Sequence, residues 1–200
     1  MIDINPKLLN GKRAKGYALD IQTLNSKLTG ADEFGHPTFE TERSPMGEAL
    51  YKLKYRNEKS KANEIAETVS DFIQNKWPDL DMVDFIVPVP PSNLARPYQP
   101  VEEVARIVAN TIGVELSEGD LVKKNKTSEL KNIADEDERF SILSDAFEIG
   151  SSKLEGKHIL LFDDLLGSGA TLRAIIDILY DMAGVNLVSV LVLTYKRTRQ

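Results

Sequence analysis

The feature of this chain that most constrains its fold is an apolar run that leads into two acids and a glycine-containing loop. Residues 159–164 read Ile-Leu-Leu-Phe-Asp-Asp, and residues 167–171 read Gly-Ser-Gly-Ala-Thr. A nearly continuous apolar run is typical of a parallel strand that is covered on both faces. Apolar residues then recur at helical spacing from Leu172 to Leu179. The sequence therefore predicts a strand, a tight loop and the N-terminus of a helix.

This order of residues suits a ligand that carries both hydroxyl groups and a phosphate. The first N–H groups of a helix lack intrahelical partners, and the helix dipole favours negative charge, so the loop is a natural anion site. The adjacent carboxylates can accept hydrogen bonds from sugar hydroxyls or hold Mg²⁺. The predicted site therefore consists of two acids that also serve as candidate metal ligands, followed by the loop: Asp163, Asp164, Gly167, Ser168, Gly169, Ala170 and Thr171.

Other interpretations of the same loop require residues that are not present. A Walker A loop needs a lysine after its last glycine, and Gly169 is followed by alanine. A dinucleotide-binding fingerprint that starts at Gly167 would need a glycine where Leu172 stands. A hydrolase elbow around Ser168 would need a glycine where Leu166 stands. A buried strand that ends in a tight turn with two solvated aspartates is the remaining, purely structural, alternative.

Composition excludes several other classes of protein. The chain has 200 residues, 42% of them hydrophobic and 28% charged, as in an ordinary soluble globular protein. It has no cysteine, which excludes disulfides and thiolate metal sites. The net charge of −6 argues against general nucleic-acid affinity. Neither a membrane span nor a signal peptide is recognisable, so we expect a cytoplasmic protein without a membrane partner.

The remaining pattern predicts an α/β fold with a mostly parallel sheet flanked by helices. Residues 1–45 read as a small β-rich segment, which we expect to form an N-terminal hood beside a core of residues 46–200 in one compact unit. Two helices are predicted between residues 45 and 77, with a break at 56–58, and another from Val101 that ends at Gly113. Strands are expected at 83–88, 120–124, 147–149, 158–163 and 187–195, and a long charged loop or a frayed helix at 125–145.

A second motif, Val-Pro-Val-Pro-Pro-Ser at residues 87–92, follows a predicted strand. Its prolines force a rigid, non-helical exit from that strand. The structural alternative is an ordinary turn that prolines stiffen.

Together these segments resemble the type I phosphoribosyltransferases. Their motif for phosphoribosyl pyrophosphate (PRPP) runs from apolar residues through two acids into a threonine-rich loop, in which Gly167 and Ser168 replace two threonines. The proline motif, Arg96 after it, and the segment Leu-Tyr-Lys-Leu-Lys-Tyr at 50–55 resemble the ComF-like branch. Lys126-Thr127, Arg139 and Ala146-Phe147 also match that branch. The cysteine zinc module of many ComF-like proteins is missing.

This resemblance implies that PRPP binds with Mg²⁺ and that a nitrogen acceptor, which the sequence does not identify, displaces pyrophosphate. Asp163 and Asp164 would hold the ribose hydroxyls, directly or through Mg²⁺, and Gly167 to Thr171 the 5-phosphate. Pyrophosphate would lie against Pro90, Pro91 and Ser92, with Arg96 adding positive charge. The lysine-rich loop 123–131 would close as a lid, with Lys124 as its candidate catalytic lysine.

The alternative function is a PRPP-binding regulatory or interaction subunit that has lost transfer. Loss of a loop threonine at Gly167 agrees with that reading. ComF-like proteins accompany DNA-uptake genes, and related chains occur in phage-defence operons. A homodimer or a complex with another protein is therefore expected, and association with nucleic acid stays open by analogy alone.

Overall fold

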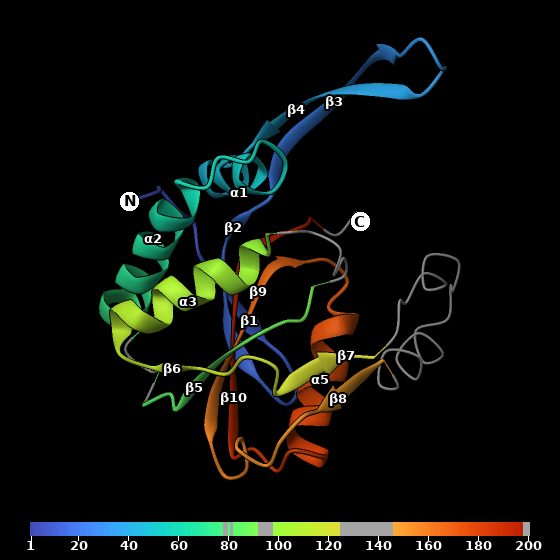
Figure 1. The fold of residues 1–200 in the computed structure, drawn as a ribbon. Helices are drawn as coiled ribbons and strands as arrows, with labels where there is room; N and C mark the ends of the chain where they lie inside the picture. The colour runs from blue at the N-terminus through green and yellow to red at the C-terminus, as the bar shows by residue number, and fades with distance from the viewer. Residues whose placement is uncertain (78–79, 81, 92–97, 125–145, 198–200) are drawn as a thin grey trace.

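A six-stranded sheet forms the centre of the molecule (Figure 1). The structure is a computed structural model that describes residues 1–77, 80, 82–91, 98–124 and 146–197. Every neighbouring pair of strands is parallel except the first, which is antiparallel. In spatial order the strands are β1 (Lys7–Asn10), β2 (Lys15–Ile21), β10 (Leu187–Tyr195), β9 (His158–Leu166), β5 (Phe85–Pro88) and β6 (Glu115–Leu116). This confirms the predicted α/β class with a mostly parallel sheet.

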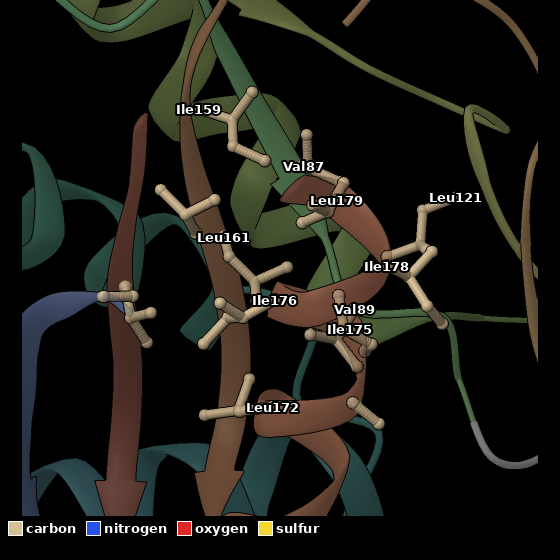
Figure 2. Packing of buried hydrophobic residues seen from close by; sticks show 14 of the residues in the cluster. Val87, Val89, Leu121, Ile159, Leu161, Leu172, Ile175, Ile176, Ile178 and Leu179 are labelled. Atoms are coloured by element: carbon tan, nitrogen blue, oxygen red, sulfur yellow. The ribbon is translucent and has the colours of Figure 1, made fainter. Parts of the chain in front are cut away.

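Helices cover both faces of this sheet. One face packs against α1 (Pro45–Tyr55), α2 (Lys61–Lys76) and α3 (Pro100–Ile112), and the other against α5 (Ala170–Asp181). Ile159 and Leu161 of β9 belong to the core beneath α5, in the same cluster as Ile175 and Ile176 of that helix (Figure 2). Leu160 and Phe162 of β9 belong to the opposite core. A strand that is apolar on both sides is thus explained by a covering layer on each side.

The helices begin and end close to the predicted residues. Ser44 caps α1 by accepting a hydrogen bond from the Gly47 N–H at 3.0 Å. The predicted break between α1 and α2 contains Asn57, whose φ is 55°. α3 ends at Gly113, as the sequence predicts. No helix within the described ranges is long and apolar enough to cross a membrane.

The neighbouring strands β5 and β9 leave the sheet in opposite directions. β5 continues through α3 to β6 on one side, whereas β9 continues through α5 to β10 on the other. Such a reversal is a topological switch point, where the connections diverge and leave a crevice at the carboxyl ends of the strands. The topology therefore places a ligand site beyond the ends of β5 and β9.

Two small two-stranded sheets complete the fold. The hairpin of β3 (Thr23–Ala31) and β4 (Pro37–Arg43) projects away from the body (Figure 1). β7 (Leu121–Lys123) pairs with β8 (Phe147–Ile149). The predicted loop at 125–145 lies outside the described residues.

The predicted hood of residues 1–45 is divided by the structure. β1 and β2 belong to the central sheet, since β2 pairs in parallel with β10, and only the β3–β4 hairpin stands outside it. The expectation that residues 1–45 form a hood beside the core is therefore corrected for β1 and β2, which are part of the core sheet. Because β2 runs parallel to β9 and β10, the hairpin leaves the sheet at the same edge where β9 ends.

Candidate functional site

A pocket of about 470 Å³ opens at the carboxyl ends of β5 and β9. That size is within the range of small-molecule sites. The segment that follows β5 contributes lining residues, and so do β7, β8, β9, α1 and the first turns of α3 and α5. The lining includes both predicted acids, the whole predicted loop and two of the motif prolines: Asp163, Asp164, Gly167, Ser168, Gly169, Ala170, Thr171, Pro90 and Pro91.

The two acids lie within β9 and not after it, because the strand continues to Leu166. Successive side chains of a strand point to opposite faces of the sheet. Leu161 belongs to the core under α5, and Phe162 to the core under α1 and α3. By the same alternation, Asp163 lies on the α5 side and Asp164 on the α1 side, so the pair straddles the edge of the sheet.

Asp164 is held by contacts on both its side chain and its backbone. Its Oδ2 accepts a hydrogen bond from Lys54 Nζ of α1 at 2.5 Å, in an ion pair whose side chains are 19% (Lys54) and 14% (Asp164) exposed. Its backbone carbonyl accepts a hydrogen bond from the buried Thr194 Oγ1 at 2.9 Å. This carboxylate is therefore fixed in position by the protein itself.

The surroundings of Asp163 disfavour the ionised form of its carboxyl group. Burial, followed by the negative charge of Asp164, raises the pKa of Asp163 to about 7. The backbone N–H of Asp164 donates to Asp163 Oδ1 at 2.7 Å and partly offsets these effects. The acidic pair thus carries negative charge that Lys54 alone does not balance, and a cation or a hydroxyl-bearing ligand would relieve it.

The glycine loop joins the end of β9 to the N-terminus of α5. Gly169 has a φ of 80°, in the left-handed region that favours glycine, and it caps α5 without a side-chain hydrogen bond. The Ala170 N–H donates to Ser168 Oγ at 3.4 Å. A Cβ on Gly167 would meet no atom within 4 Å, so that position has room for a larger residue. The helix N-terminus of the predicted anion site is thus part of the pocket lining.

The proline motif supplies the opposite wall. β5 ends at Pro88, and the Val89 N–H still donates to the Phe162 carbonyl at 2.8 Å, which continues the pairing with β9 by one residue. Pro90 and Pro91 then turn away along the pocket. Ser92 and Arg96, the other predicted contacts for pyrophosphate, lie outside the described residues.

The two neighbouring lysines of the predicted lid lie in different surroundings. Lys123 lines the pocket, and burial lowers the pKa of its ammonium group. Lys124, the predicted catalytic lysine, does not line the pocket and instead forms an ion pair with Glu148 at 3.1 Å. The rest of the predicted lid, at 125–131, lies beyond the described part of the chain.

Some lining residues were not predicted, because they come from elements remote in sequence. They are Lys54, Phe147 and the residues at the beginning of α3, 99–102, whereas Lys123, which also lines the pocket, was predicted as part of the lid. A signal for Lys54 does exist in the sequence: Leu50, Leu53 and Lys54 share one face of α1, and both leucines are buried. A lone lysine on a buried helical face indicates an acidic partner.

Comparisons with known proteins bear on the C-terminal half of this pocket. Residues 98–200 match the family model described as the phosphoribosyl transferase domain. No match was found among curated proteins. A solved hypoxanthine phosphoribosyltransferase from Staphylococcus aureus is similar at 16% identity and a TM-score of 0.43, over 70% of this chain and 65% of that one. Adenine phosphoribosyltransferase from Saccharomyces cerevisiae is similar at 13% identity and a TM-score of 0.45, over 86% and 84%.

Proposed function

Because this chain belongs to the phosphoribosyl transferase domain family, we propose that it binds PRPP and displaces pyrophosphate from it with a nitrogen acceptor. One observation carries the proposal. The paired acids of β9 and the glycine loop at the N-terminus of α5 line one pocket at the switch point of the sheet. Hydroxyl-binding and phosphate-binding groups are therefore adjacent, as a sugar phosphate requires.

In this proposal each wall of the pocket binds one part of PRPP. Asp163 and Asp164 accept hydrogen bonds from the ribose hydroxyls, and the loop from Gly167 to Thr171 binds the 5-phosphate through backbone N–H groups. Pro90 and Pro91, continued by Ser92 and Arg96, face the pyrophosphate. The carbon that reacts then lies between the acids and the prolines, where an acceptor approaches from the open side.

The acidic pair also fits Mg²⁺. This metal usually binds one or two carboxylates, and substrate phosphates and water complete its coordination. Asp163 and Asp164 would hold it, and a cation there would stabilise the ionised form of Asp163, which burial and the charge of Asp164 disfavour. When bound, the ion supplies positive charge that stabilises pyrophosphate as a leaving group.

The chain's own residues would contribute to catalysis by positioning the substrate and by stabilising charge electrostatically. Displacement at the ribose carbon develops positive charge on the sugar, which fixed carboxylates stabilise without reorganisation. Holding the ribose and the phosphate in one geometry converts part of the binding energy into rate. We propose that the lysine-rich segment from residue 123 onward closes as a lid, and that the β3–β4 hairpin acts as the hood for the acceptor.

The finer assignments belong to the same proposal. Placement in the ComF-like branch, a cytoplasmic location, and a homodimer or protein partner follow from the motif resemblance. The unit of residues 46–200 would be the catalytic core, completed by β1 and β2. Association with nucleic acid is kept as an outcome to test, since the net charge of −6 does not favour it.

A second function, PRPP binding without transfer, is favoured by one observation in the loop. Gly167 stands where the resembling family has a threonine, so one hydroxyl donor to the phosphate is missing. Such a chain would sense PRPP as a regulatory or interaction subunit of a DNA-uptake or phage-defence complex. The two functions differ in one measurable product, which is released pyrophosphate.

The test combines binding and turnover. Calorimetry with PRPP and Mg²⁺ should show binding to the native chain, and Asp163→Asn and Asp164→Asn should each cost about 1.5–3 kcal/mol of binding free energy. Asp71→Asn, on α2 and outside the pocket lining, is the matched control and should bind normally. Unchanged affinity in both pocket variants would exclude the sugar-phosphate assignment. Pyrophosphate release with candidate acceptors, nucleic acid and cell extract included, decides between enzyme and sensor.

A further inference from the structure

Lys54 reaches the pocket from a helix that lies outside the family match. The match covers residues 98–200, whereas α1 spans Pro45–Tyr55. Leu50 and Leu53 anchor this helix in the core with 3% and 2% exposure. Lys54 follows them on the same face, and its stem is therefore held between the core and the pocket.

The ion pair with Asp164 puts the lysine where a metal ion would have to bind. Lys54 Nζ lies 2.5 Å from Asp164 Oδ2. A magnesium ion bound to that oxygen would lie about 2.0–2.1 Å from it. Two cations so close together repel each other strongly at a site that is shielded from water. Free Mg²⁺ and the Lys54 ammonium therefore compete for Asp164.

A sugar phosphate changes this competition, because it brings acceptors of its own. Ribose hydroxyls can take the place of Lys54 at Asp164. Phosphate oxygens can then accept the hydrogen bonds of the Lys54 ammonium group, which has left Asp164. The four-carbon stem of lysine allows such an exchange without movement of the helix. A ligand with hydroxyls alone, or a free cation alone, offers only half of it.

We propose that Lys54 is a specificity-determining residue of this pocket. Without a ligand it is the counterion of Asp164 and excludes free divalent cations. It leaves the carboxylate only when the phosphate of a bound ligand accepts the hydrogen bonds of its ammonium group. The part of this inference that concerns PRPP rests on the proposed function. The part that concerns free cations rests on the ion pair alone.

The first experiment measures Mn²⁺ binding to the protein without any other ligand, by electron paramagnetic resonance of the unbound ion. Lys54→Met keeps an unbranched side chain one atom shorter than lysine and removes its charge, so its Mn²⁺ affinity should rise at least tenfold above that of the native chain. Lys54→Arg should behave like the native chain. Lys52→Met is the matched control, because Lys52 lies on the same helix, pairs with Glu48 and does not line this pocket.

Equal Mn²⁺ affinity in native and Lys54→Met proteins would overturn the inference and leave Lys54 as a structural brace only. Circular dichroism establishes that each variant is folded. If Lys54→Met does not fold, Lys54→Gln replaces it with the same expectation, since its amide can still donate to Asp164 without a charge.

The second experiment measures PRPP binding in the presence of a chelator. Without any metal, Lys54→Met should bind PRPP at least tenfold more weakly than the native and Lys52→Met proteins, because the ammonium has lost its role at the phosphate. Equal affinity would overturn the exchange. Absence of PRPP binding to the native chain under all conditions would instead refute the proposed function. The Mn²⁺ comparison would still test whether Lys54 is the counterion of Asp164.

Discussion

β2 and the β3–β4 hairpin follow each other in sequence and have opposite surroundings. β2 is buried along almost its whole length between β1 and β10. The hairpin is exposed along nearly all of both strands, including its large apolar residues Leu28 and Phe39 at 59% and 56%. Both were predicted as one β-rich segment. Local sequence pattern therefore detects strands, but it does not tell which of them the sheet takes up.

What separates the two regions is how closely another chain segment approaches. β2 contains Gly16 and Ala18 in its pairing with β10, and small residues permit close approach of a backbone or a side chain. The hairpin instead pairs Lys27 with Glu40 and Leu28 with Phe39, and larger side chains project on both of its faces. A two-stranded hairpin is marginally stable on its own in water. We therefore expect it to tolerate changes that β2 does not.

The largest effect should come from Gly16→Val. A Cβ at this position would lie 1.7 Å from the backbone carbonyl oxygen of Val190, so β2 and β10 would have to separate. We expect a loss of more than about 3 kcal/mol in unfolding free energy, beyond ordinary overpacking, or no folded protein. Urea unfolding followed by circular dichroism measures it. Ala31→Val adds similar bulk to the exposed hairpin, and a comparable loss there would break the comparison.

Removing the hairpin should separate folding from function. Thr23 and Arg43 are partners in the pairing register, so a short glycine-serine linker can replace residues 24–42. We expect the fold and PRPP binding to survive, and transfer to be lost because the hood no longer orders the acceptor or excludes water. The assay is PRPP calorimetry beside pyrophosphate release.

Two results would count against this expectation. Full transfer by the shortened chain would rule out the hairpin as hood, and an unfolded product would show that it belongs to the core. Truncation of residues 1–40 does not answer the question, because it also removes β2. That truncated chain should fail to fold.

At the pocket, Gly169→Val should abolish phosphate binding while leaving the sheet folded. A β-branched residue at a φ of 80° costs about 1–2 kcal/mol of stability and would also block the backbone approach to the anion. Gly167→Thr is the control, since that position is open, and it should tighten PRPP binding or leave it unchanged. A large loss of PRPP affinity in folded Gly167→Thr would show that the loop binds the phosphate in another way.

The smallest effects should appear in the pH dependence of stability. Burial raises the pKa of Asp120, but hydrogen bonds from Ser117 and Ser151 outweigh it and hold that pKa below its ordinary value. Asp32, at the turn of the hairpin, also has a lowered pKa, because it accepts the backbone N–H groups of His36 and Phe34. The two carboxylates therefore shift alike in different surroundings.

A lowered pKa stabilises the fold above the unfolded-state pKa of about 3.9, and this contribution is lost as the pH falls through the folded-state value. Asp120→Asn should therefore cost about 1–2 kcal/mol at pH 7 and flatten the decline of stability below pH 4. Asp32→Asn should leave the global curve unchanged, since the hairpin is exposed. Urea unfolding between pH 3 and pH 7 distinguishes them, and equal effects would mean that the hairpin folds with the core.

The sequence predicted most of the core for a clear physical reason. β9, α5 and β10 follow one another, and each has a strong local pattern of apolar residues, so their order and class are readable without the structure. The position of β2 in the sheet could not be predicted from the sequence, because its partner β10 lies at the other end of the chain. No local pattern records such a pairing.

The candidate site divides in the same way. Asp163, Asp164 and the loop are contiguous, so the spacing of residues alone predicted that they meet. Lys54 comes from another helix, and only the folded chain brings it to Asp164. The role predicted for Lys124 stays a prediction, and its neighbour Lys123 is the residue that lines the pocket. Successive side chains of a strand point to opposite faces, and the sequence around β7 does not fix which.

The pairing of β2 with β10 also sets the order in which this protein can be assembled during synthesis. Gly16 faces Val190, about 170 residues later in the chain. A ribosome adds roughly 5–20 residues per second, so β2 waits about 10–35 s for β10 after it emerges, with only β1 beside it in the sheet. The hairpin strands β3 and β4, in contrast, are made next to each other. The central sheet therefore closes only when β10, the last strand made, pairs with β2, and until then the edge of β2 that faces away from β1 stays open to chaperones or to other chains.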